Sequence, residues 1–144
     1  MKNIKPLIFT CILLFAVNIV FAQSSDEKAI RAILDTQSSE WNKGNVEGFM
    51  HGYWDNDSLM FIDNNGISYG WKKALDNYKK GYPDTTSMGK LDFKLLKVNK
   101  LSGSYYFVIG KWHLARTKGD VGGAFTLLFR KINNKWVIVA DHSS

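Results

Sequence analysis

The chain has 144 residues, a formal net charge of +6 and a single cysteine. This length is enough for one hydrophobic core but not for two. The cysteine, Cys11, lies in an apolar N-terminal stretch, so the rest of the chain has no disulfide, thiolate metal site or cysteine nucleophile. The positive residues are scattered and form no compact run. This distribution indicates a solvated surface and argues against nucleic-acid binding.

The first 22 residues have the pattern of a secretory signal peptide. Lys2 and Lys5 precede an apolar run over residues 7–21, and the small residue Ala22 ends it. The run is shorter than the ~20 residues that a membrane-spanning helix needs. We therefore expect cleavage after Ala22 and a periplasmic or secreted protein with no membrane association after cleavage. Residues 23–144 are expected to form a single domain.

The first half of this domain is expected to be helical. Apolar residues at helical spacing predict helices over residues 27–41, from 45 to 53 or 54, and over 71–80. Gly44 suits the left-handed position that commonly follows a helix. A short strand over residues 59–62 and a tight turn over 63–66 separate the second and third helices.

The second half is expected to form an antiparallel meander. Alternating apolar residues predict strands over residues 90–101, 105–116, 124–132 and 136–142, with Asn133 and Asn134 as a hairpin turn. Helices followed by consecutive antiparallel strands indicate an α+β fold with the helices packed on one face of the sheet.

The last strand is apolar on both faces, as is typical of a central strand. Strict alternation puts its side chains on two opposite faces: Trp136, Ile138, Ala140 and His142 on one, and Val137, Val139 and Asp141 on the other. We therefore expect His142 to point into the space that the sheet encloses. Asp141 is expected to lie at a dimer face or a loop contact, where it cannot orient His142.

Four segments carry a resemblance to a known family: Trp41–Phe49, Asp57–Ile62, Gly66–Gly70 and Trp136–Ser143. In this order and spacing they resemble the nuclear-transport-factor-two-like superfamily, which includes ketosteroid isomerase and the SnoaL-like polyketide cyclases. They are most similar to a secreted branch related to the association domain of calcium/calmodulin-dependent kinase. The resemblance covers almost the whole domain. It implies a cone-shaped fold whose curved sheet and helices enclose a pocket, but it specifies no reaction, because this fold hosts many functions.

Two residues are candidates for general acid/base catalysis. His142 carries an imidazole, which titrates near neutral pH; the alternative is a structural histidine that hydrogen-bonds to backbone. Asp63 follows the short strand, near the position where the resemblance implies the general-base carboxylate of ketosteroid isomerase. Its alternative is a turn aspartate bonded to its own backbone. The other two catalytic positions of that isomerase correspond to Gln37 and the neighbourhood of Thr126, so its full chemistry is not expected here.

Five further residues are expected to contact a ligand. Trp112 and Arg116 share one face of the strand over residues 105–116, where an arginine suits a carboxylate or enolate. The alternative for Arg116 is a rim salt bridge. Tyr53, Trp54 and Tyr78 offer apolar rings with a polar tip, which suit a hydrophobic pocket. The histidines lack metal-ligand spacing, so neither a metal nor a cofactor is expected.

The sequence therefore predicts a domain that binds a small hydrophobic or amphipathic molecule. It leaves open whether the protein is an enzyme that performs cofactor-free acid/base chemistry on that molecule. The alternative is a non-catalytic association domain. Under both readings we expect a homodimer through the convex face of the sheet, which carries Phe107, Ile109, Val137 and Val139.

Overall fold

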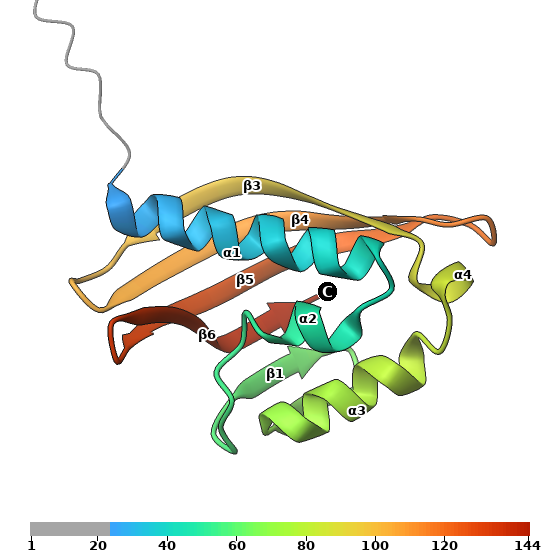
Figure 1. The fold of residues 1–144 in the computed structure, drawn as a ribbon, viewed down its shortest axis with the longest axis horizontal. Coiled ribbons are helices and arrows are strands. Elements are labelled where there is room, and N and C mark those ends of the chain that lie inside the picture. The colour runs from blue at the N-terminus through green and yellow to red at the C-terminus, as the bar shows by residue number, and fades with distance from the viewer. Residues whose placement is uncertain (1–23) are drawn as a thin grey trace, which may run out of the picture.

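The structure is a computed structural model that describes residues 24–144, so the expected signal peptide over residues 1–22 lies outside the described part. Helices and short strands precede long strands along the chain (Figure 1). The helices are α1 Ser25–Asn42, α2 Val46–Met50, α3 Trp71–Gly81 and α4 Thr85–Met88. The strands are β1 Met60–Asp63, β2 Gly66–Tyr69, β3 Lys90–Lys100, β4 Tyr105–Ala115, β5 Val121–Ile132 and β6 Lys135–Ser143. Among the described helices, none is long and apolar enough to span a membrane.

Helix α1 forms where the apolar spacing predicts it. Ile30, Leu34 and Trp41 fall on one side of the helix and are buried, and Gln37 lies on the same side. The Ser24 hydroxyl accepts a hydrogen bond from the backbone N–H of Glu27 at 3.1 Å and caps the helix start. The chain then turns at Gly44, whose φ of +82° confirms the predicted left-handed residue.

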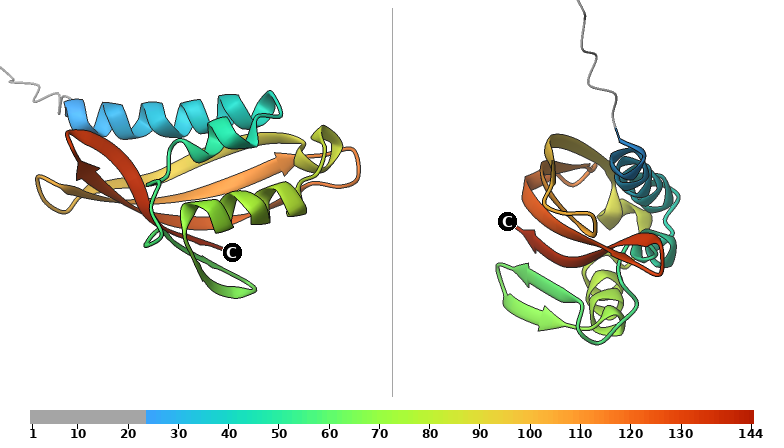
Figure 2. Two further views of the ribbon diagram at one scale, coloured as in Figure 1. Left: turned by 60° about the horizontal axis from the view of Figure 1, so that its bottom comes forward. Right: turned by 90° about the vertical axis from the view of Figure 1, so that its left-hand side faces the viewer.

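The strands form one six-stranded sheet in the order β2-β1-β6-β5-β4-β3. Strands β3 to β6 form the predicted antiparallel meander, and β1 pairs in parallel with β6. Positive φ angles at Asn133 and Asn134 make the tight turn between β5 and β6. The sheet is strongly curved, and the helices lie on one of its sides (Figure 2). This arrangement is the α+β fold that the sequence predicts.

Three local features differ from the sequence-based expectation. Helix α2 ends at Met50 instead of Tyr53 or Trp54, because residues 52–54 run alongside β6: Trp54 N–H donates to the Ile138 carbonyl. Strand β2 and helix α4 are short and were not expected from the apolar pattern; three of the four β2 residues are exposed. Strand β5 begins at Val121, three residues earlier than predicted, because Gly122 and Gly123 hide the apolar alternation.

One glycine of the sheet is required by packing. Gly110 on β4 lies opposite Phe125 on β5, and a Cβ at Gly110 would enter the space that the Phe125 ring occupies. The ring in turn packs edge-on against Phe93 of β3, with centroids 5.3 Å apart. The missing side chain therefore lets an aromatic ring cross the neighbouring strand on the inner face.

A β-bulge at Val139 corrects the predicted faces of the last strand. Leu128 of β5 pairs with Ala140, while the next residue, Phe129, pairs with Ile138, so Val139 has no partner in β5. An extra residue on one strand reverses the sides of all side chains beyond it. Ile138 is therefore buried as expected, but Asp141 points inward and is buried, whereas His142 is exposed.

Candidate functional site

A cavity of about 900 Å³ lies between the helices and the inner face of the sheet. Aromatic side chains form a large part of its walls. The helical side contributes Trp41, Phe49, Tyr78 and Tyr82, and the sheet contributes Phe61, Phe93, Trp112 and Phe125. Edge-to-face contacts fix several of these rings; the ring centroids of Trp41 and Phe49, for example, lie 5.1 Å apart.

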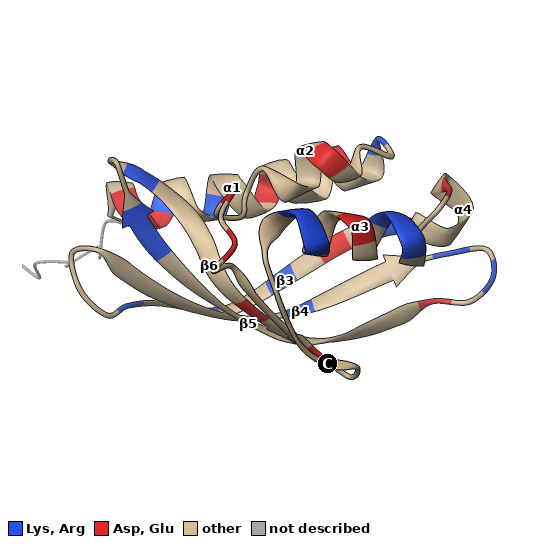
Figure 3. Cartoon of the chain, turned by 90° about the horizontal axis from the view of Figure 1, so that it is seen from below, with Lys and Arg blue, Asp and Glu red and all other residues tan. Residues whose placement is uncertain are grey.

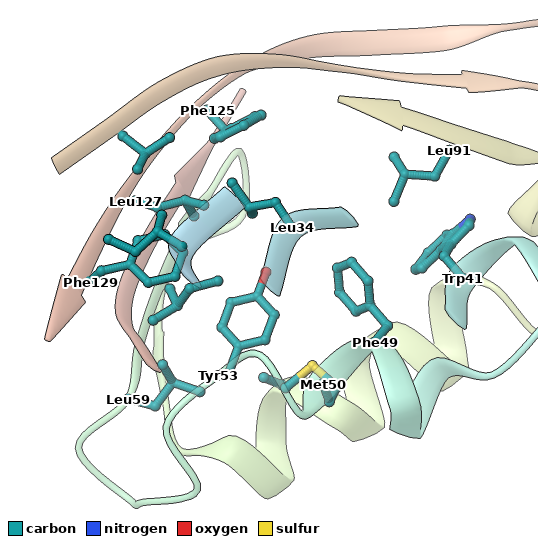
Figure 4. Packing of buried hydrophobic residues seen from close by; sticks show 14 of the residues in the cluster. Leu34, Trp41, Phe49, Met50, Tyr53, Leu59, Leu91, Phe125, Leu127 and Phe129 are labelled. Carbon is teal, nitrogen blue, oxygen red and sulfur yellow. The ribbon is translucent and has the colours of Figure 1, made fainter. Parts of the chain in front are cut away.

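A buried carboxylate, Asp141, lies in the wall of this cavity. Its two oxygens accept different hydrogen bonds: the Tyr53 hydroxyl donates to Oδ2 at 2.7 Å, and the Ser143 hydroxyl donates to Oδ1 at 2.8 Å. Figure 4 shows the Tyr53 ring among buried side chains of the helices and the sheet. Within residues 24–144 no lysine, arginine or histidine forms an ion pair with Asp141.

Local backbone structure brings Tyr53 and Asp141 together. The segment after α2 docks on β6 through two backbone hydrogen bonds, from Trp54 N–H to the Ile138 carbonyl and from Ile138 N–H to the Gly52 carbonyl. This docking holds Tyr53 beside Ile138. The bulge at Val139 then turns the side chain of Asp141 to the same inner side. The site therefore depends on both the docked segment and the bulge.

Burial sets the proton affinity of this site. It raises the pKa of Asp141 from 3.8 to about 6, although the hydrogen bonds from Tyr53 and Ser143 lower it. Burial, followed by the nearby charge of Asp141, also raises the pKa of both Tyr53 and Tyr78. At neutral pH Asp141 is therefore mostly ionised, and the two hydroxyls stay protonated. A carboxylate with a pKa near the working pH suits proton transfer.

The structure brings five of the seven expected site residues to the cavity. Tyr53, Asp63, Tyr78, Trp112 and Arg116 all line it. The Asp63 carboxylate also accepts a hydrogen bond from the Asn65 N–H at 2.7 Å, which is the turn interaction named as its alternative. Asp63 therefore lines the cavity while its carboxylate caps the turn after β1.

The remaining two expected residues, His142 and Trp54, do not line the cavity. His142 is exposed and pairs with Thr126 of β5 and Ile62 of β1 on the outer side of the sheet. Trp54 is half-buried beside β6 and donates from its backbone N–H to Ile138. The placement of His142 in the enclosed space was wrong, because the bulge exchanges its side with that of Asp141.

Positive charge lies near one end of the cavity. Lys80 of α3 and Arg116, which follows β4, both line it. Figure 3 shows lysine and arginine on α3 and in the loop between β4 and β5. Across residues 24–144, no group of three or more His, Cys, Asp or Glu side chains is placed to hold a metal ion. The polar residues that line the cavity therefore include tyrosines and serines, the buried carboxylate of Asp141, the exposed carboxylate of Asp63, amides such as Asn77, and the cations of Lys80 and Arg116.

Comparisons with known proteins identify relatives among solved structures. The chain is 42% identical to an NTF2-like protein of unknown function from Shewanella oneidensis MR-1, with a TM-score of 0.80, over 83% of this chain and 98% of that one. No protein-family model and no curated protein sequence matches the chain.

Two more distant structures share the fold alone. One is a calcium/calmodulin-dependent protein kinase II association-domain protein from Xanthomonas campestris. It is 16% identical to this chain, with a TM-score of 0.64, over 85% of this chain and 89% of that one. The other is a ketosteroid isomerase-like protein from Erwinia carotovora atroseptica. It is 14% identical to this chain, with a TM-score of 0.64, over 85% of this chain and 97% of that one. Both agree with the resemblance seen in the sequence.

Proposed function

Because the chain belongs to the NTF2-like family, we propose that it binds a small hydrophobic or amphipathic molecule in its aromatic cavity and exchanges a proton with it through Asp141. The fold itself specifies no activity, so the proposal rests on the site. The observation that carries it is a buried carboxyl without an ion-pair partner among the described residues, in the wall of a cavity of about 900 Å³.

Asp141 supplies the proton acceptor of this proposal. With a pKa of about 6, it is mostly ionised at pH 7 and still retains appreciable basicity. The hydroxyls of Tyr53 and Ser143 hold its two oxygens in place, which limits the reorganisation needed when a proton arrives. The aromatic side chains in the walls suit an apolar ligand body. The reaction class is thus cofactor-free proton transfer to and from an apolar substrate.

A thermal-shift screen tests the proposal. The purified protein is heated with apolar acids, sterols and aromatic polyketide-like compounds, alongside the variants Asp141→Asn and His142→Ala. A compound at a hundred times its dissociation constant stabilises the fold by about 2.7 kcal/mol, which corresponds to several degrees for a domain of this size.

The two variants distinguish a contact in the cavity from a general effect. We expect the shift to fall in Asp141→Asn and to persist in His142→Ala, because His142 lies on the outer side of the sheet. A shift that is equal in all three proteins would remove Asp141 from the site. If no compound shifts the folded wild-type protein, the cavity is not a binding site and the association-domain function is favoured.

The second candidate is the association function, which would use the outer face of the sheet. The outer face of the sheet carries half-exposed apolar side chains on β4, β5 and β6: Phe107, Ile109, Leu128, Val137 and Val139. Side chains of this kind on one face suit burial against a second copy of the chain. We expect a homodimer through this face in either function. Light scattering at micromolar concentration should give twice the monomer mass, and Ile109→Lys should give the monomer mass; a monomeric wild-type protein would exclude the dimer.

We also propose that the protein is exported after removal of residues 1–22. The proposal rests on the signal-peptide pattern in the sequence. N-terminal sequencing of the protein isolated from the periplasm or the medium should begin at Gln23. An intact N-terminus beginning at Met1 in the cytoplasm would contradict it.

A further inference from the structure

The buried side of helix α1 includes one polar residue, Gln37. The other buried residues of this helix, Ile30, Leu34 and Trp41, are apolar. Gln37 is only 1% exposed, and it lines the cavity. A methionine would fill a similar space without an amide, and burial of a polar group is unfavourable unless the group is hydrogen-bonded. The partners of the two polar atoms of Gln37 therefore indicate what the amide does.

The nitrogen of this amide has a structural role. Gln37 Nε2 donates to the backbone carbonyl of Phe49 at 3.0 Å, near the C-terminal end of α2, where helix carbonyls lack partners within the helix. A carbonyl oxygen only accepts, so the nitrogen of the amide must face Phe49. Gly52 packs against the same amide, because a Cβ at Gly52 would lie 2.8 Å from both Gln37 Cδ and Nε2. These two contacts fix the orientation of the amide.

The oxygen of the amide is available to a ligand. Gln37 Oε1 has no hydrogen-bond partner within residues 24–144. Over the same residues, Trp112 Nε1 is the only side-chain nitrogen or oxygen that is both completely enclosed and without a partner. Gln37 Oε1 is therefore not completely enclosed. Because Gln37 is buried and lines the cavity, the accessible surface of this oxygen opens on the cavity.

A second amide on the same helix provides a contrast. Asn42 Nδ2 donates to the Leu91 carbonyl at 3.0 Å, and Asn42 Oδ1 accepts from the Leu91 N–H at 2.7 Å. Both polar atoms of Asn42 thus bond to strand β3, outside the cavity. The amide of Asn42 is satisfied by the protein alone, whereas at Gln37 the protein satisfies only the nitrogen.

One short segment connects Gln37 to the buried carboxylate. The segment over residues 49–53 accepts a hydrogen bond from Gln37 through the Phe49 carbonyl and donates one to Asp141 through the Tyr53 hydroxyl. Gln37 and Asp141 both line the cavity, and both carry acceptor oxygens. An acceptor oxygen repels a ligand carbonyl or enolate oxygen and attracts a hydroxyl. These residues therefore favour a ligand that offers a hydrogen-bond donor.

We infer that Gln37 determines the specificity of the cavity, because its Oε1 accepts a hydrogen bond from a hydroxyl group of the ligand. The cavity then takes an alcohol or a phenol with an apolar ring body in preference to a ketone of similar shape. This inference rests on the proposed function, since the ligand occupies the same cavity, and it adds the class of polar group that the ligand carries. Gln37 binds and selects the ligand, while Asp141 exchanges the proton.

Two probes of similar shape test this selection. The alcohol 1-(2-naphthyl)ethanol, used as separate enantiomers, carries a hydroxyl where 2-acetylnaphthalene carries a carbonyl. Isothermal titration calorimetry measures both probes against the wild-type protein and Gln37→Met, which removes the amide from a side chain of similar length. We expect one enantiomer of the alcohol to bind the wild type roughly fivefold more tightly than the ketone, because one hydrogen bond distinguishes them. Gln37→Met should bind that enantiomer and the ketone with equal affinity.

Two controls separate ligand binding from the structural role of the amide. Asn42→Leu removes an amide of the same helix that bonds only to the protein, so it should lower stability and retain the preference for the alcohol. Carbon-13 NMR of the wild-type protein needs no variant. The Gln37 Cδ resonance should move downfield with the alcohol, because its carbonyl accepts a hydrogen bond, and should not do so with the ketone. This readout still decides the question if Gln37→Met fails to fold.

The outcomes that overturn the inference differ from those that overturn the proposed function. If the wild type binds alcohol and ketone equally and the Gln37 Cδ resonance responds to neither, the role of Gln37 is refuted while the binding cavity stands. If the preference persists in Gln37→Met and is lost in Asp141→Asn, the carboxylate holds the hydroxyl and the role of Gln37 is again refuted. If neither probe binds the wild type, the inference fails, and the wider thermal-shift screen decides the proposed function.

Discussion

The raised pKa of Asp141 makes the stability of the fold depend on pH in a direction that can be measured. The carboxyl has an ordinary pKa of 3.8, and burial raises it to about 6. The difference of about 2.2 pKa units corresponds to about 3 kcal/mol at 1.36 kcal/mol per unit. Asp141→Asn replaces the carboxyl by a neutral amide of similar shape, which remains neutral across this pH range.

The sign follows from proton binding. Folded Asp141 holds its proton more tightly than the unfolded chain does, so protonation stabilises the fold. This contribution is fully present below about pH 3.8 and is lost as the pH rises through about 6, with a slope of about 1.4 kcal/mol per pH unit between them. Asp141→Asn does not lose it. Its free energy of unfolding should therefore rise by about 3 kcal/mol relative to the wild type between about pH 3.5 and pH 7.

Urea unfolding of both proteins at several pH values measures this difference. Some exposed or half-exposed acids have lowered pKa values through hydrogen bonds to the charged form, among them Asp26, Glu40 and Asp84. They destabilise the fold as the pH falls, but equally in both proteins, so they cancel in the difference. A difference that stays constant with pH, or that falls as the pH rises, would refute the burial of an ionisable Asp141.

Two further substitutions test the packing of the site. Tyr53→Phe removes the donor to Asp141 Oδ2, so it should raise the pKa of Asp141 further and reduce the free energy of unfolding by about 1–3 kcal/mol. Carbon-13 NMR of the carboxyl measures the pKa, and urea unfolding measures the free energy. A titration midpoint of Asp141 that does not move would contradict the hydrogen bond. Gly110→Ala should cost about 1–3 kcal/mol because its Cβ meets the Phe125 ring. Gly103→Ala, whose Cβ meets nothing within 4 Å, should change stability by less than about 0.5 kcal/mol. Equal losses for these two variants would refute the packing.

The sequence predicts most of the fold because its apolar residues follow the helical and strand periods closely. Ile30, Leu34 and Trp41 are spaced for one side of a helix, and all three are buried. The two asparagines at 133 and 134 adopt the positive φ angles that a two-residue hairpin requires. Short elements such as β2 lack a buried face of their own, so their residues carry little periodic signal.

The site was harder to predict because the bulged residue, Val139, exchanges the two sides of the sheet for the side chains that follow it in β6. A strand that is apolar on both faces tolerates an extra residue without placing a polar side chain visibly out of phase, so Val139 gives no sign in the sequence that it is bulged. Two segments pair with β6 on either side of the bulge: residues 52–54 dock at Ile138, and β1 pairs from Ala140 onward. That pairing is long-range, and neither helical nor strand periodicity reveals it.

A carbon-13 NMR titration of the Asp141 carboxyl, with and without a saturating probe, a compound that shifts thermal unfolding of the wild-type protein, tests the central claim most directly. The account predicts a midpoint near pH 6 in the free protein. It predicts a higher midpoint with the probe bound, because an apolar body displaces water from the carboxylate and disfavours its charge. A midpoint near the ordinary 3.8, or one that does not respond to the bound probe, would contradict a buried carboxyl in the wall of a ligand cavity.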